Sequence, residues 1–100
     1  MKALRGSHRA AQDLLDIGGY IAADDPIAAR RWVDRLRAKA STAATVPMAG
    51  RRVPELRRED VREVFLRTYR IVYRVLDDSI VVLTVFEGHR RLPPLDPDDT

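Results

Sequence analysis

The stretch VREVFLRTYRIVYRV, residues 61–75, alternates bulky apolar residues with charged ones and decides the kind of fold that this chain adopts. Val, Ile, Leu, Phe and Tyr are the residues that strands favour, and they occupy nine of these fifteen positions. The pattern predicts two strands, at 61–66 and 69–75. A third apolar run at 80–86 follows the short polar connection 76–79, so we expect an antiparallel meander of three strands.

Side chains alternate between the two faces of a strand, and the middle strand has two different faces. One face carries Tyr69, Ile71, Tyr73 and Val75, which we expect to pack under helices. The other face carries arginines, at Arg70 and Arg74, around Val72. The sequence therefore predicts a sheet with one helix-covered face and one arginine-bearing face.

Two amphipathic helices precede the meander. Ser7 can cap a helix over residues 8–23, whose apolar residues recur at helical spacing, although the pair Gly18-Gly19 lies inside it. Each of these glycines costs about 1 kcal/mol against alanine, so either the second helix packs very closely there or the helix is irregular.

Asp25 and Pro26 start the second helix, in which Trp32 lies on the apolar side and is expected in the core. The short connection between the two helices predicts an antiparallel hairpin. The expected class is α+β, with an N-terminal helical hairpin packed on one face of a small antiparallel sheet. Met1 to Arg5 can add an edge strand. Residues 1–92 form a single domain in this interpretation, and residues 93–100, rich in Pro and Asp, form a frayed or extended tail.

Composition narrows the classes of function. A chain of 100 residues with no cysteine forms one domain without disulfides or thiolate metal sites, which fits a cytoplasmic protein. The two histidines, His8 and His89, lie too far apart for a local zinc motif, so we expect neither a metal nor a cofactor. No apolar run reaches the roughly 18 residues that span a bilayer, so we expect no membrane partner.

Charge leaves two interpretations open. Formal net charge is +3, and 16 of the 18 cationic residues are arginine. Because the guanidinium group is a planar fork that matches carboxylate and phosphate, such a bias indicates nucleic acid or an acidic protein partner. High-GC codon usage, which raises Arg, Ala and Asp together, explains it equally well.

Taken in order, four stretches resemble the RelE/ParE superfamily of toxins from bacterial toxin-antitoxin pairs. They are SHRAAQDLLDIGGYIAADDPIAARRWVDRL, PMAGRRVPEL, VREVFLRTYRIVYRV and SIVVLTVFEGHRR. The segments YIAADDP and GRRVPEL are more similar to the ParE branch than to the ribosome-dependent RelE branch.

The resemblance implies an RelE/ParE-like domain that arrests growth and is held inactive by a cognate ParD-like antitoxin, whose C-terminal segment wraps the toxin. Operator DNA would be reached only indirectly, through the antitoxin. ParE-like members are linked to inhibition of DNA gyrase without a known hydrolytic site, whereas RelE-like members are endoribonucleases that cut messenger RNA. A toxin remnant that only binds its antitoxin is a third possibility, against which an intact arginine cluster argues.

RNA cleavage through the 2′-hydroxyl needs a base, an acid and cationic support for the phosphate. Arg67 and Arg90 match positions where RelE-like nucleases keep phosphate-stabilising arginines. Such nucleases place a tyrosine or similar residue a few positions beyond the terminal arginine, whereas here the sequence is Leu92-Pro93-Pro94-Leu95. His89 with Glu87 could substitute, but a surface histidine beside arginines is more often a plain polar residue. We therefore expect no catalytic residue, with His89, Arg67 and Arg90 as the set to consider if the chain is a nuclease.

The remaining candidates are expected to contact a partner. The set comprises the arginines of the sheet and the polar end of the last strand: Arg62, Arg67, Arg70, Arg74, Glu87, His89, Arg90 and Arg91. The alternative for the sheet arginines is that they pair with the acidic residues Glu55, Glu59, Asp60 and Glu63. The hypothesis carried forward is a cytoplasmic ParE-like toxin that inhibits DNA gyrase and binds an acidic, amphipathic antitoxin segment.

Overall fold

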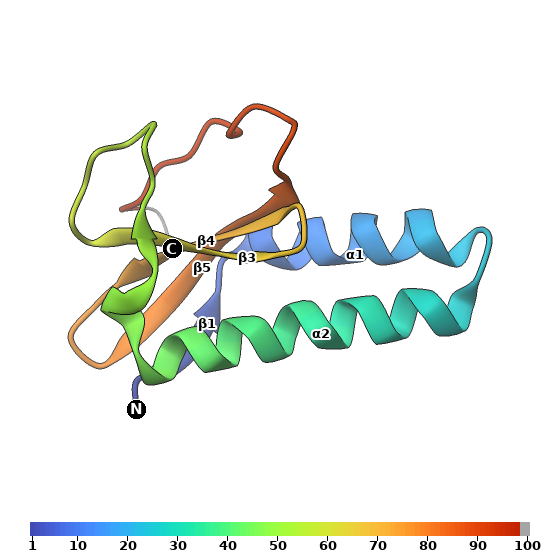
Figure 1. Ribbon diagram of the computed structural model, residues 1–100, viewed down its shortest axis with the longest axis horizontal. Helices are drawn as coiled ribbons and strands as arrows, with labels where there is room; N and C mark the ends of the chain where they lie inside the picture. The colour runs from blue at the N-terminus through green and yellow to red at the C-terminus, as the bar shows by residue number, and fades with distance from the viewer. Residues whose placement is uncertain (99–100) are drawn as a thin grey trace.

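Residues 1–98 are described by the computed structural model, which contains two helices and a five-stranded sheet (Figure 1). The elements follow in the order β1 (Ala3–Gly6), α1 (His8–Ala22), α2 (Pro26–Thr45), a 3-10 turn (Pro47–Ala49), β2 (Arg51–Arg52), β3 (Val61–Leu66), β4 (Tyr69–Val75) and β5 (Ser79–Glu87). Within this range, no helix combines the length and the apolar character that crossing a membrane requires.

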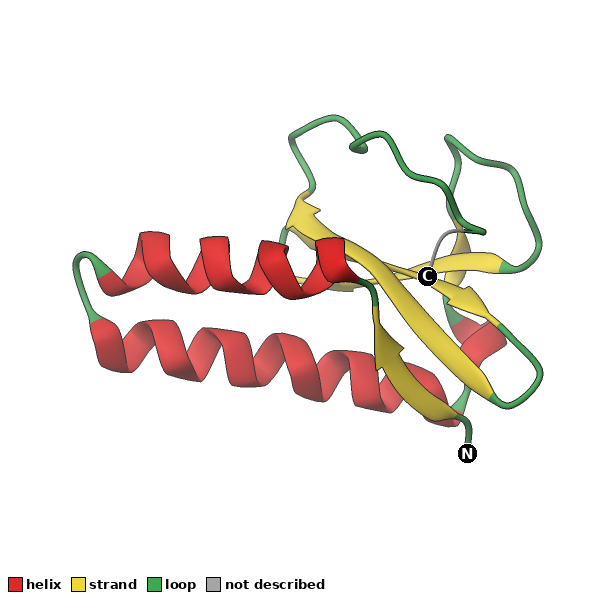
Figure 2. Ribbon diagram, turned by 180° about the vertical axis from the view of Figure 1, so that it is seen from behind, coloured by secondary structure: helices red, strands yellow, loops and turns green. Residues whose placement is uncertain are grey.

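The sheet has the strand order β1-β5-β4-β3-β2, and its centre is the predicted meander. β3, β4 and β5 pair antiparallel, with Glu63 opposite Val72 and Arg70 opposite Phe86. The predicted edge strand at the N-terminus is β1, which runs parallel to β5 because the helical hairpin lies between them in the chain (Figure 2). β2 is a short edge strand that pairs with β3 over two residues.

Both helices begin where the capping residues predict. The Ser7 hydroxyl accepts a hydrogen bond of 3.0 Å from the Ala10 N–H. The Asp25 carboxylate accepts from the N–H groups of Ile27 and Ala28 at 3.1 and 3.0 Å. These bonds satisfy amide groups that have no partner inside the helix, and they set the first residue of each helix.

The two helices pack closely at the first glycine of the Gly18-Gly19 pair. A Cβ atom placed on Gly18 would lie 3.2 Å from Val33 Cγ2 in α2, whereas a Cβ on Gly19 would meet nothing within 4 Å. Of the two explanations given for the glycines, close packing therefore applies to Gly18, and α1 continues unbroken through both residues.

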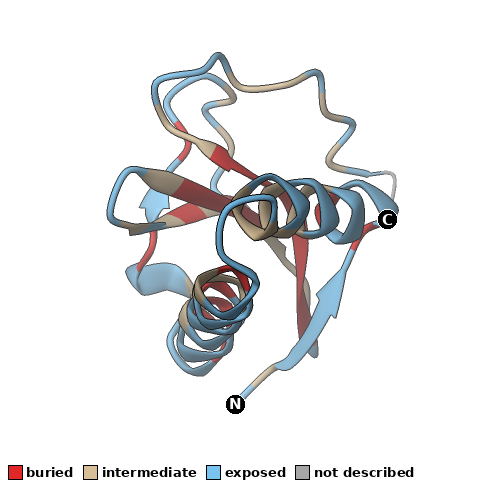
Figure 3. Cartoon of the chain, turned by 90° about the vertical axis from the view of Figure 1, so that its right-hand side faces the viewer, coloured by how far each residue is buried: buried red, intermediate tan, exposed pale blue. Residues whose placement is uncertain are grey.

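The main core lies between the helices and one face of the sheet, which appears in Figure 3 as buried segments facing inward. The largest members are Tyr73, Ile71, Ile80 and Leu36, together with the small Ala44. As predicted, Trp32 packs against this core, where it meets Tyr69 edge to face with ring centroids 5.6 Å apart. Both aromatic rings therefore contribute by packing between a helix and the sheet.

The other face of the sheet carries Arg70 and Arg74, as expected, and it is also covered by apolar side chains. A second apolar cluster fills that face. Its buried members are Val53, Val61, Val72, Val81, Leu83 and Phe86. Leu56 from the β2–β3 connection and Leu92 and Leu95 from the C-terminal segment close over it, as the arching chain in Figure 1 illustrates.

The C-terminal segment is extended, as expected, but through residue 98 it is held to the sheet and is not frayed. Arg74 donates to the Pro97 carbonyl at 3.2 Å, and both Arg74 and Arg58 form ion pairs with Asp98, at 3.2 and 3.5 Å. Leu92 and Leu95 gain burial from this arrangement, which offsets the entropy of ordering the segment. Residues 99 and 100 of the predicted tail lie outside the described residues.

Candidate partner-binding site

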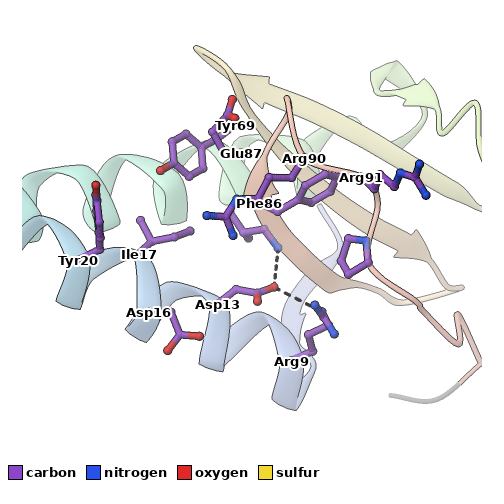
Figure 4. A pocket seen from close by; sticks show the side chains of 12 residues that line it. Arg9, Asp13, Asp16, Ile17, Tyr20, Tyr69, Phe86, Glu87, Arg90 and Arg91 are labelled. Carbon is purple, nitrogen blue, oxygen red and sulfur yellow. Dashed lines mark hydrogen bonds and ion pairs between the residues drawn. The ribbon is translucent and has the colours of Figure 1, made fainter.

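An open groove of about 640 Å³ lies where the middle of α1, the ends of β4 and β5 and the start of the C-terminal segment meet (Figure 4). Its apolar lining comes from Ile17, Tyr69, Val85 and Phe86, among others. Its cationic side chains are Arg9, Arg90 and Arg91. Tyr20 is 84% exposed at the end of the groove formed by α1. The groove thus combines an apolar lining with cations, which is the composition that an amphipathic acidic segment requires.

Asp13 is an acidic residue of the groove whose charge is satisfied inside the molecule. Its carboxylate accepts hydrogen bonds from the Thr84 hydroxyl at 2.5 Å and from the Val85 N–H at 3.0 Å. Arg9, one turn earlier in α1, lies 3.9 Å from the same oxygen. Asp13 therefore joins α1 to β5, and its own charge is compensated inside the molecule. The other acidic residues that line the groove are Asp16 and Glu87.

Glu87 and His89 form a local pair at the end of β5. His89 Nδ1 lies 2.7 Å from Glu87 Oε1, and the His89 backbone N–H donates to Glu87 Oε2 at 3.1 Å. Burial opposes ionisation of Glu87, but hydrogen bonds from the His89 N–H and the Thr68 hydroxyl outweigh it and lower the pKa of the carboxyl group. Glu87 is thus held as a carboxylate that orients an imidazole, while the imidazole itself projects into water with 81% of its side chain exposed.

Arg90 and Arg91, predicted as partner contacts, line the groove, and neither forms an ion pair with any residue from 1 to 98. Arg67, predicted with them, lies in the β3–β4 turn with a left-handed backbone (φ 51°) and an exposed side chain. The Gly88 N–H donates to the Thr68 carbonyl at 2.7 Å, so this turn adjoins the one that carries His89. The sequence thus predicted a set of polar residues that the fold brings to one end of the sheet.

Arg70, by contrast, is buried at 6% exposure in an ion-pair network. It donates to Glu63 Oε1 at 2.6 Å and to both Glu55 oxygens at 2.8 Å, and its guanidinium group lies 5.1 Å from the centre of the Phe86 ring. Arg51 donates to the other oxygen of Glu63 at 2.6 Å. The hydrogen bonds from Arg70 lower the pKa of Glu55 to about 2, and those to Glu55 and Glu63 raise the pKa of Arg70.

Arg74 and Arg62 also bind acidic residues of the chain. Arg74 lies 3.1 Å from Asp60, whose pKa is lowered by hydrogen bonds from Arg58 first and from Arg74 in addition. Arg62 is opposite Tyr73 in the β3–β4 pairing and therefore lies on the helix side of the sheet, separate from Arg70 and Arg74. It pairs with Glu59 at 2.9 Å and donates to the Gly50 carbonyl at 3.1 Å. Arg62, Arg70 and Arg74 thus form the acidic pairs that were the alternative, and Arg62 does not join the other two in one cluster.

The groove has members that the sequence analysis did not identify as a site, chiefly Arg9, Asp13 and Tyr20 of α1. The only signal available was that Arg9 and Asp13 lie one turn apart and away from the apolar stripe, which many solvent-exposed residues also do. Among residues 1–98 no three His, Cys, Asp or Glu side chains are placed to hold a metal ion together.

The fold is that of a small α+β protein in which a helical hairpin packs on one face of a five-stranded sheet. The family described as ParE toxin of type II toxin-antitoxin system, parDE, matches residues 4–92, and the chain belongs to this family. The ParE branch predicted from the sequence is therefore confirmed.

Two proteins illustrate the similarity. A protein of Sinorhizobium fredii (strain NBRC 101917 / NGR234) named "Putative toxin Y4kP" is 37% identical over 94 residues, which cover 92% of this chain and 94% of that protein. A chain in a solved structure of the chromosomal ParDE TA system from P. aeruginosa superposes with a TM-score of 0.71 at 23% identity, over 87% of this chain and 96% of that chain. At that identity the superposition establishes a shared fold, which is the predicted α+β arrangement.

Proposed function

We propose that this ParE-family toxin arrests growth by inhibiting DNA gyrase, as a protein inhibitor and not as a nuclease. The observation that carries this proposal is the chain that follows Arg90. In that segment Leu92 and Leu95 pack on the second apolar cluster, and the stretch Leu92-Pro93-Pro94-Leu95 stands where RelE-like nucleases keep a tyrosine or similar residue. These four residues therefore stabilise the fold and carry no ionisable side chain.

The state of His89 supports the same view. General acid–base catalysis requires a proton donor or acceptor held against the substrate, usually in a partly desolvated site. His89 is mostly exposed, and its one ordered partner is Glu87, two residues earlier. An exposed imidazole beside Arg90 and Arg91 suits a polar contact with a protein partner better than acid–base catalysis in a desolvated site.

The groove supports neutralisation by a ParD-like antitoxin. The cationic groups of Arg90 and Arg91 are available to acidic side chains, and Ile17, Tyr69 and Phe86 are available to apolar ones. A disordered antitoxin segment that folds on binding would gain both contacts at once. Of the arginines proposed as partner contacts, Arg67, Arg90 and Arg91 can bind without breaking an internal pair, whereas Arg62, Arg70 and Arg74 would first have to leave an acidic residue.

The decisive experiment follows DNA and messenger RNA in one culture after induction from a tightly repressed promoter. We expect gyrase-dependent DNA breaks with intact transcripts. In parallel, the purified protein added to purified gyrase should inhibit supercoiling of a relaxed plasmid. Growth arrest with intact DNA, accompanied by rapid transcript cleavage, would overturn the proposal.

A RelE-like endoribonuclease is the second candidate. The observation in its favour is the hydrogen bond between Gly88 and Thr68, because it joins the turn of Arg67 to the turn of His89. Arg90 belongs to the same turn as His89, so the three residues to consider if the chain is a nuclease lie on two adjoining turns. Cleavage of a purified RNA or of ribosome-bound messenger, lost in His89→Ala, would support this second candidate.

A further inference from the structure

Positive charge is concentrated on α2. This helix carries five cations, Arg30, Arg31, Arg35, Arg37 and Lys39, and a single acidic residue, Asp34. The formal charge of α2 is therefore +4. Because the whole chain carries +3, the other 80 residues together carry a charge of −1. A small protein that is close to neutral except for one helix has a defined electrostatic surface and not a general basic character.

These cations differ from the arginines of the sheet in that they have no acidic partners. Between Arg51 and Arg74 six arginines form ion pairs with acidic side chains of the chain, as at Arg70 and Glu63. On α2, none of the five cations forms an ion pair with a residue in the described range 1–98. Codon usage explains how many arginines there are, but it does not explain why those of one helix face lack carboxylate partners.

The exposed face of α2 presents its arginines in two rows. Arg30 and Arg37 are two turns apart and form one row, and Arg31 and Arg35 are one turn apart and form the other, with Asp34 between the rows. The opposite side of the helix, with Ala29, Leu36 and Ala40, faces the core. Figure 3, which looks along the helices, shows that the outer side of α2 is exposed and that neither the sheet nor the C-terminal segment crosses it.

We propose that this outer face of α2 binds the phosphate backbone of duplex DNA. Over the about 10 Å from Arg30 to Arg37, a duplex presents about six phosphates on its two strands, enough for all four exposed arginines. The major groove of B-form DNA is about 12 Å wide and admits a helix, so the two rows can reach the two backbones that flank it. Direct contact of the toxin with DNA goes beyond the expectation that DNA is reached only through the antitoxin, and it does not depend on gyrase being the target.

Duplex DNA fits this face better than other polyanions do. Proteins that bind single strands add exposed aromatic rings on which bases stack, whereas the one aromatic residue of α2, Trp32, is partly buried against Tyr69. The major groove of A-form RNA is too narrow for side chains to enter from a helix. An acidic, amphipathic peptide needs apolar contacts beside its charges. Between the two rows this face offers Asp34 and Ala38, and its one large exposed apolar side chain, Ile27, lies at the first turn of the helix.

The test measures binding of the purified full chain to a fluorescent duplex of random sequence at NaCl concentrations between about 50 and about 200 mM. Four or five phosphate contacts predict a slope of log K against log salt of about −4, since each contact contributes about 0.9. The variant Arg30→Gln/Arg31→Gln/Arg37→Gln should reduce that slope in magnitude by about 3, with a circular dichroism spectrum and melting temperature close to those of the parent. Arg35 is left in place because it lies over the Trp32 ring, with Cζ 5.1 Å from the centroid.

The matched control, Arg5→Gln/Arg52→Gln/Arg57→Gln, removes three exposed arginines from other surfaces and should keep the parent slope. If the salt slope fell equally in the control, net charge alone would explain the effect and the proposal would be overturned. Absence of DNA binding by the parent would also overturn it. Tighter binding to a single strand, or displacement of the duplex by polyglutamate at equal charge, would also overturn it. Because this assay contains no gyrase, its failure and a failure of gyrase inhibition are recorded separately.

Discussion

At the scale of single residues, the most consequential arrangement is the buried carboxylate of Glu63, which is 1% exposed and held by two arginines. Burial removes the charge of Arg70 from water, which costs free energy of desolvation. This cost is offset only while the acidic partners remain ionised and in contact. The network also fixes the β2–β3 connection to the sheet through Glu55. Loss of one carboxylate of this network should therefore lower the free energy of unfolding far more than loss of a surface ion pair.

Glu63→Gln should lower the free energy of unfolding by about 3 kcal/mol, because an amide leaves two guanidinium groups short of a counter-charge in a buried site. Urea unfolding followed by circular dichroism measures this loss. Glu59→Gln is the control, since its carboxylate is 70% exposed and its pairs with Arg52 and Arg62 should contribute less than about 1 kcal/mol. Equal effects of the two substitutions would contradict the role of burial.

Glu55 predicts how stability depends on pH. Its hydrogen bonds from Arg70 lower its pKa from 4.5 to about 2. A carboxyl group whose pKa is lower in the folded state stabilises the fold above its unfolded pKa and loses that contribution as the pH falls through its folded pKa. In urea unfolding, the parent should therefore be more stable than Glu55→Gln at neutral pH, with a difference that shrinks between about pH 4.5 and about pH 2. A difference that stayed constant over this window would mean that the Glu55 charge does not contribute.

At the scale of elements, the two glycines of α1 have different environments and predict different outcomes. Gly19→Ala should raise the free energy of unfolding by about 0.5 to 1 kcal/mol, because alanine is the better helix former and its methyl group meets nothing within 4 Å. Gly18→Ala should gain less or lose, since its methyl group must displace Val33 at 3.2 Å. Thermal or urea unfolding of the two variants side by side checks the order, and a larger gain at residue 18 would contradict the close packing of the helices there.

The helices and the meander could be predicted because their signals are local. Ser7 and Asp25 are capping residues at the correct spacing, and the period changes from helix to strand after residue 60. The cover of the second sheet face could not be predicted, because Leu92 and Leu95 stand in a proline-rich segment without periodicity. Their burial depends on tertiary contacts that begin with Arg74 and Asp98.

The candidate site was predictable at one end only. Glu87, His89, Arg90 and Arg91 follow the last strand directly, so their proximity is a property of the sequence. The contribution of α1 to the groove depends on how the hairpin crosses the sheet, which no local pattern encodes. The sheet arginines show the converse. Strand alternation correctly placed Arg70 and Arg74 on one face, and pairing with nearby carboxylates was the alternative, but the burial of Glu63 and Arg70 depends on the tertiary cover of that face.

At the scale of the whole molecule, the exposed histidine and the two neighbouring arginines separate a binding protein from a nuclease. His89→Ala should leave growth arrest essentially intact, because an exposed side chain paired only with Glu87 adds little to a protein contact. If His89 were the general acid or base of a nuclease, the same change would reduce cleavage by roughly a hundredfold or more. The assay is the number of viable cells after induction, with toxin levels compared by immunoblot.

Unlike His89→Ala, the double substitution Arg90→Glu/Arg91→Glu should impair binding by the groove. Reversing both charges of the groove should weaken binding of an acidic antitoxin segment at least about tenfold, which corresponds to about 1.4 kcal/mol, and should reduce growth arrest if gyrase contacts the same surface. Titration calorimetry with the antitoxin measures the first effect and plasmid supercoiling by gyrase measures the second. Because neither arginine has an internal ion pair among residues 1–98, the melting temperature should change little, and a protein that unfolds on this substitution would contradict their assignment to a free binding surface. Full toxicity and full antitoxin affinity in the folded variant would move the binding surface away from this groove.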